Sequence, residues 1–114
     1  MPEKARVFVA EDDKDYQWLI EHNLIEAGHS VVLRAETFND AVRAIGQFGE
    51  LGVQVATIDG NFTPNDTSGF DGLLLVEAIS RLAPQVKTVG LSGSGIQGVT
   101  VDLGKEQLDI LVGK

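Results

Sequence analysis

The chain has 114 residues, no cysteine, and 17 acidic against 9 basic residues, for a net charge of −8. This length holds one domain, and the lack of cysteine excludes disulfides, thiolate metal sites and cysteine nucleophiles. The acidic balance argues against direct binding of nucleic acid, which needs a basic face, and no apolar run reaches membrane-spanning length. We therefore expect a single cytoplasmic domain over residues 1–114.

Short apolar runs alternate with segments of helical periodicity, which predicts an α/β fold. Residues 6–10 are typical of a buried parallel strand, and this strand stops at the acidic run 11–13. Residues 15–27 carry apolar side chains at helical spacing, with Gly28 placed to end the helix. Residues 30–33 predict a second strand. Thr37 and Asp40 resemble a capping box that opens the next helix.

The second half of the chain repeats this alternation. Residues 53–58 predict a third strand that runs into Asp59, and residues 60–71 have the composition of a loop. A helix is predicted over about 72–82, followed by strands at 86–91 and 110–112. Residues 95–108 contain glycines that interrupt a helix, so we expect this segment to be short-helical or irregular.

Polar side chains follow the predicted strands at the points where the strands end. Glu11, Asp12, Asp59, Ser92 and Lys114 each come after an apolar run. In a parallel sheet these residues collect at one edge, where open α/β folds bind ligands. Converging carboxylates need a cation, and oxygen ligands without cysteine favour Mg²⁺. A hydroxyl and an ammonium beside them would suit a phosphoryl group on Asp59.

Four runs together resemble a known family. They are Val9-Ala10-Glu11-Asp12-Asp13, Ile58-Asp59, Gly90-Leu91-Ser92-Gly93 and Ile110-Leu111-Val112-Gly113-Lys114. In this order and at strand ends, they resemble the signature of the CheY-like receiver domains of bacterial response regulators. The resemblance implies a flavodoxin-like, doubly wound, five-stranded parallel sheet of order 2-1-3-4-5, with helices on both faces.

The resemblance also implies a metal site and a phosphoacceptor. Asp59 matches the aspartate that the family phosphorylates. Asp12 matches the direct ligand of Mg²⁺, Glu11 matches its acidic neighbour acting through water, and Asn61 lies where the family gives a backbone carbonyl to the metal.

Ser92 and Lys114 match the family's switch hydroxyl and its invariant lysine. The partners implied are a histidine kinase or phosphotransfer protein and an effector protein that the sequence does not identify. Such a domain is a signalling module in two-component signal transduction rather than an enzyme, although it assists its own phosphorylation and dephosphorylation.

Several features depart from the family pattern. The loop after Asp59 is longer than usual, Leu111 replaces the switch aromatic residue, and the sequence stops at Lys114, where the family continues into a fifth helix. Without that helix, Val7, Val9 and Leu111 would lack cover on one sheet face. We therefore expect either self-association through this face or a native chain that is longer, with a truncated C-terminus here.

Other interpretations stay open at this point. The chain could be a pseudo-receiver, a protein-interaction module that is not phosphorylated. Residues 59–63 also resemble the D-x-D-x-T motif of haloacid-dehalogenase-like phosphatases, but Asn61 cannot act as the general acid those enzymes need. Residues 93–98 match G-x-G-x-x-G, yet too few residues follow for a dinucleotide fold. We expect His22 and His29 to be solvated and Trp18 to be a packing residue.

Overall fold

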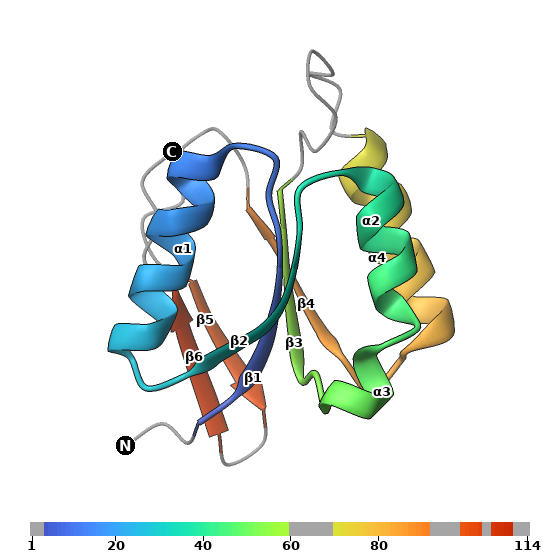
Figure 1. Ribbon diagram of the computed structural model, residues 1–114. Coiled ribbons are helices and arrows are strands. Elements are labelled where there is room, and N and C mark those ends of the chain that lie inside the picture. The colour runs from blue at the N-terminus through green and yellow to red at the C-terminus, as the bar shows by residue number, and fades with distance from the viewer. Residues whose placement is uncertain (1–3, 60–69, 92–98, 104–105, 111–114) are drawn as a thin grey trace.

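Four short strands form a parallel sheet in the computed structural model, which describes residues 4–59, 70–91, 99–103 and 106–110 (Figure 1). The strands are β1 (Arg6–Ala10), β2 (Ser30–Ala35), β3 (Val55–Asp59) and β4 (Lys87–Leu91). Their order is β2-β1-β3-β4, and every neighbouring pair is parallel. This confirms the predicted order for the first four strands.

Helices cover both faces of the sheet (Figure 1). α1 (Lys14–Glu26) lies on one face, and α2 (Phe38–Ile45) and α4 (Phe70–Leu82) lie on the other. Both predicted caps are present, because Thr37 Oγ1 accepts the Asp40 N–H at 3.1 Å, and Gly28 adopts a φ of 94° just after α1 ends. The sequence did not predict the short helix α3 (Phe48–Leu51).

The side chains of β1 alternate between two hydrophobic cores. Phe8 and Ala10 pack with residues of α2 and α4, whereas Val7 and Val9 pack on the α1 side. All four are at most 1% exposed. The near-continuous burial explains why residues 6–10 form an apolar run, as expected for a parallel strand covered on both faces.

The prediction for the C-terminal segment is wrong. Residues expected to be short-helical or irregular form β5 (Val99–Leu103), which pairs antiparallel with β6 (Glu106–Ile110) in a separate two-stranded sheet. Ile110, expected to open a fifth parallel strand, instead ends β6. Within the described residues the parallel sheet therefore has four strands. Leu111 and Val112 lie outside them.

This β5–β6 hairpin covers the sheet face where the sequence predicted a gap. Leu108 and Ile110 are at most 1% exposed and pack in the same core as Val7, Val9 and α1. The prediction that Val7 and Val9 lack cover is therefore wrong, because a hairpin lies where a fifth helix was expected (Figure 1). Among the described residues, no helix has the length and apolar character needed to span a membrane.

Candidate functional site

The strand register brings the ends of β1, β3 and β4 to one edge of the sheet. Ala10 pairs with Ile58, so Glu11 and Asp12 leave β1 at the level where β3 reaches Asp59. Asp59 in turn pairs with Leu91, the last residue of β4. The backbone thus gathers the predicted site residues at the carboxyl edge, where α/β sheets bind ligands.

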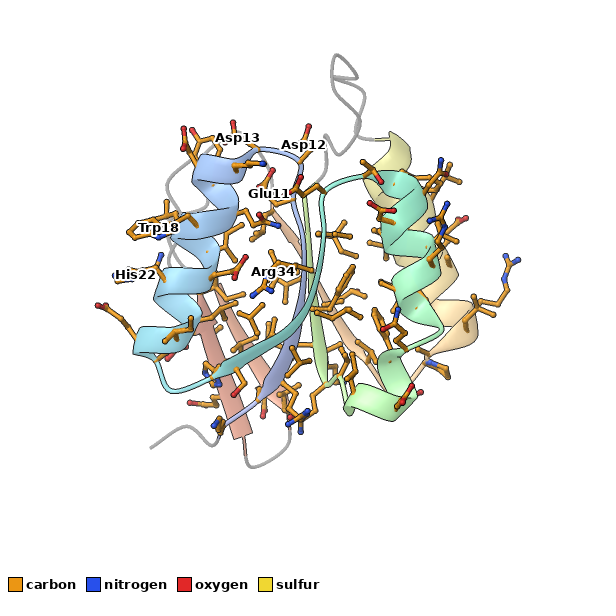
Figure 2. All side chains as sticks on the ribbon, in the orientation of Figure 1. Glu11, Asp12, Asp13, Trp18, His22 and Arg34 are labelled. Atoms are coloured by element: carbon orange, nitrogen blue, oxygen red, sulfur yellow. The ribbon has the colours of Figure 1, made fainter. Side chains whose placement is uncertain are left out.

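Glu11 and Asp12 leave β1 with different exposures. The Glu11 N–H donates to Ala35 O at 3.1 Å and extends the pairing with β2. The Glu11 side chain is fully buried, and its Oε2 accepts the Asp13 N–H at 3.3 Å. The Asp12 side chain is half-buried and lies at the top of the sheet edge in Figure 2. A buried and a half-buried carboxylate therefore follow one another at this edge.

Asp13 takes a structural role, because an aspartate just before a helix favours the N-cap position. Its Oδ1 accepts the N–H groups of Asp15 at 2.9 Å and Tyr16 at 3.3 Å and so caps α1. The cap fixes the turn between β1 and α1. It thereby holds Glu11 and Asp12 at the sheet edge rather than along the helix.

The remaining predicted site residues are only partly covered by the structure. Asp59 is placed by its backbone as the last residue of β3, and its side chain lies outside the described residues. Asn61, Ser92 and Lys114 also lie outside them. Ser92 directly follows Leu91 in sequence, and Asn61 follows Asp59 by two residues. Because both lie outside the described residues, their roles stay predictions.

The donors that are present suit a hard divalent cation. Glu11 and Asp12 offer carboxylate oxygens beside the end of β3, and Mg²⁺ prefers oxygen ligands supplied by one or two carboxylates. Among the side chains that the structure describes, no three of the histidine, aspartate and glutamate residues lie close enough together to hold a metal ion. A complete ligand set would therefore need Asp59, whose carboxylate is outside that description.

Two residues were misread from the sequence. His29 is 3% exposed, and its Nδ1 accepts the Ala5 N–H at 3.0 Å, so the prediction of a solvated imidazole is wrong. Burial lowers the pKa of His29 below its ordinary value of 6.5, and the negative charge of Asp109 opposes this only in part. Trp18 is 65% exposed rather than packed. No local pattern signals either outcome, since both depend on distant segments.

Several solved structures with a similar arrangement are described as receiver domains. One is the signal receiver domain of a modulated diguanylate cyclase from Desulfovibrio desulfuricans G20, described as an example of alternate folding. The TM-score is 0.65 at 16% sequence identity, and the match covers 82% of this chain and 68% of that one. Another is the isolated REC domain of RcsB from Salmonella enterica serovar Typhimurium, with a TM-score of 0.65 at 20% identity over 83% and 66%. This chain has the receiver-domain fold.

A CheY-like receiver domain protein from Methanospirillum hungatei JF-1 gives a similar receiver match, with a TM-score of 0.64 at 19% identity over 82% of this chain and 68% of that one. The chain thus spans about two thirds of the length of these receiver proteins. No family model matches the sequence, and no curated protein matches it either. The receiver fold is thus established by structure alone.

Proposed function

We propose that this chain is a phosphoacceptor receiver domain of two-component signal transduction. In this proposal Asp59 accepts a phosphoryl group from a histidine kinase or phosphotransfer protein in the cytoplasm, in the presence of Mg²⁺. The observation that carries it is the register of β1 and β3, which puts buried Glu11 and half-buried Asp12 beside the end of the strand carrying Asp59. The receiver fold supports the same function.

The reaction transfers a phosphoryl group from a histidine side chain of the donor protein to Asp59. A carboxylate oxygen of Asp59 forms the new P–O bond while the P–N bond of a phosphohistidine breaks, and the freed imidazole takes up a proton. Mg²⁺, when bound, would offset negative charge on the transferring phosphoryl oxygens. Asp12 and Asp59 would be its direct ligands, with Glu11 acting through water and Asn61 through its carbonyl.

Two further residues complete the proposed site. Ser92 would donate a hydrogen bond to a phosphoryl oxygen, and the Lys114 ammonium would form an ion pair with another. The protein then supplies alignment and charge, while the high-energy donor drives the chemistry. The RcsB receiver domain has been determined with the phosphomimetic BeF3−, so beryllofluoride is a suitable probe of the same site here.

Phosphorylation by acetyl phosphate tests the proposal. We expect intact-mass spectrometry to show one acid-labile phosphoryl group on the wild type with Mg²⁺ present, and none on Asp59→Asn or after chelation with EDTA. Asp102→Asn removes an equivalent charge from an exposed position on β5 and should behave as the wild type. Absence of the phosphoryl group from all proteins would support the pseudo-receiver alternative, in which the fold serves only protein interaction.

A further inference from the structure

A chain of hydrogen bonds links the carboxylate of Glu11 to the first turn of α1. Glu11 Oε2 accepts the Asp13 N–H at 3.3 Å. Asp13 Oδ1 in turn accepts the N–H groups of Asp15 at 2.9 Å and Tyr16 at 3.3 Å. Figure 2 shows Glu11 and Asp13 at the junction of β1 and α1. Asp13 therefore joins a residue of the proposed metal site to the helix.

The backbone of Asp13 is held in place at the start of α1. Asp13 has an extended conformation, with a φ of −90° and a ψ of 119°, and its carbonyl accepts the Gln17 N–H at 2.9 Å. This bond and the side-chain cap attach the same residue to the helix twice. Together they set the direction in which the Asp13 N–H points. That direction matters because a hydrogen bond weakens steeply when the N–H group turns away from its acceptor.

Glu11 is held at its backbone and at its carboxylate by different segments. Its N–H donates to Ala35 O on β2 at 3.1 Å, and its side chain is fully buried. A buried carboxylate costs free energy unless hydrogen bonds or a cation offset its charge. The Asp13 N–H supplies one such hydrogen bond and restrains the plane of the carboxylate. Removing the hydrogen bonds that orient the groups around a metal typically weakens metal binding by about 10- to 100-fold.

We propose that Asp13 is a positioning residue for the Mg²⁺ site, which acts through Glu11 and does not bind the metal itself. The Asp13 side chain caps α1, the cap directs the Asp13 N–H at Glu11 Oε2, and that hydrogen bond orients the carboxylate. The coupling is reciprocal, because two linked binding equilibria change each other by the same factor. Bound Mg²⁺ would therefore stabilise the first turn of α1. This inference rests on the proposed function, since it assumes Mg²⁺ beside Asp59.

Titration of Mg²⁺ into the full chain, followed by amide NMR shifts at constant ionic strength, tests the positioning role. We expect the Kd for Mg²⁺ to rise about 10-fold in Asp13→Ala, which loses the cap. Asp13→Asn keeps an acceptor oxygen and should bind Mg²⁺ within about threefold of wild type. The difference between the two variants then reports the cap, because both lack the negative charge.

Thr37→Ala is the matched control. It removes the cap of α2, where Thr37 Oγ1 accepts the Asp40 N–H at 3.1 Å, and so costs a similar amount of stability. Its Kd for Mg²⁺ should stay within about twofold of wild type, since additive effects are expected for sites without shared partners. Equal weakening of Mg²⁺ binding in Asp13→Ala and Asp13→Asn, or in Asp13→Ala and Thr37→Ala, would overturn the positioning role and leave the metal site in place.

Amide hydrogen exchange measures the same coupling from the side of the helix. Saturating Mg²⁺ should slow exchange of the Asp15 and Tyr16 N–H groups by up to about 10-fold, the factor by which the cap strengthens Mg²⁺ binding. The Asp40 N–H in the cap of α2 is the internal control and should not change. Unchanged exchange in the first turn of α1 would contradict the coupling.

The titrations also separate this inference from the phosphoacceptor function. A wild type that binds Mg²⁺ but takes no phosphoryl group from acetyl phosphate would contradict that function, whereas the Kd values would still decide the role of Asp13. A wild type that binds no Mg²⁺ at millimolar concentrations would overturn both.

Discussion

At the scale of single residues, the three acidic residues after β1 differ in role: one caps a helix and two lie at the sheet edge. Asp13 caps α1 through the N–H groups of Asp15 and Tyr16, whereas Glu11 is buried and Asp12 is half-buried at the sheet edge. Asp13 thus supplies the cap of α1, while Glu11 Oε2 accepts the Asp13 N–H at 3.3 Å. Three adjacent acids can thus contribute to a fold and to a proposed site together, because they differ in burial and in hydrogen-bond partners.

The Asp13 cap makes a measurable contribution to stability. Asp13→Ala leaves two N–H groups at the start of α1 without their acceptor, so we expect a loss of about 1 kcal/mol in the free energy of unfolding. Asp13→Asn keeps an acceptor oxygen and should remain within a few tenths of a kcal/mol of wild type. Urea denaturation measures both. Equal loss in the two variants would show that charge, and not the cap, is responsible.

His29 should make stability depend on pH. Burial lowers its pKa in the folded state, so below about pH 6.5 the unfolded chain takes up a proton that the folded chain resists. Stability should therefore be unaffected by His29 at higher pH and should fall as the pH drops through this range. Protonation of Nδ1 would also remove the acceptor of the Ala5 N–H.

A series of urea denaturations from about pH 8 to about pH 5 checks this. His29→Asn keeps an acceptor for Ala5 but cannot titrate, so its stability should change less with pH than that of the wild type. Gln107→Ala changes an exposed side chain that does not titrate and is the control, with the wild-type pH dependence expected. A His29→Asn variant that loses stability on acidification as steeply as the wild type would contradict the role given to His29.

At the scale of elements, the β5–β6 hairpin completes the core on the α1 face. Leu108 and Ile110 are buried there, while Thr100 Oγ1 donates to Asp109 Oδ1 at 2.8 Å across the hairpin's outer side. A two-stranded ribbon is marginally stable alone, so packing against the sheet must stabilise it. The hairpin is thus an integral part of the core.

Leu108→Ala tests that statement. Leu108 is fully buried, so truncation should destabilise the whole domain by about 2–5 kcal/mol and speed amide exchange in β1 as well as in the hairpin. Gln107→Ala changes the exposed neighbour on the same strand and should stay within about 0.5 kcal/mol of wild type. If Leu108→Ala affected exchange only within residues 99–110, the hairpin would be a separate, weakly attached unit.

Sequence periodicity predicted the four parallel strands and their helices because each is a local pattern. The apolar run of β1 and the capping residue Thr37 need no knowledge of distant contacts. The hairpin could not be predicted in the same way, although Val99, Val101 and Leu103 alternate with polar residues. Whether such a strand joins the parallel sheet or packs on its face depends on which segments, distant in sequence, it contacts in the folded chain. The burial of His29 and the exposure of Trp18 depend on tertiary contacts for the same reason.

At the scale of the whole molecule, an open parallel sheet sets the position of the site. Parallel strands end at a common edge, so residues separated by about half the chain meet there without any local signal between them. Glu11 and Asp12 directly follow β1, and the neighbouring strand β3 ends at Asp59.

Chemical mapping of the phosphorylated residue is the most direct measurement of the central claim. The protein is treated with acetyl phosphate and Mg²⁺, reduced with borohydride, which converts an aspartyl phosphate to homoserine, and digested for peptide mass spectrometry. We predict homoserine at position 59 alone, and none when EDTA replaces Mg²⁺. Homoserine at another aspartate, or an unmodified Asp59 in a protein that binds Mg²⁺, would contradict the assignment of this chain as a phosphoacceptor through Asp59.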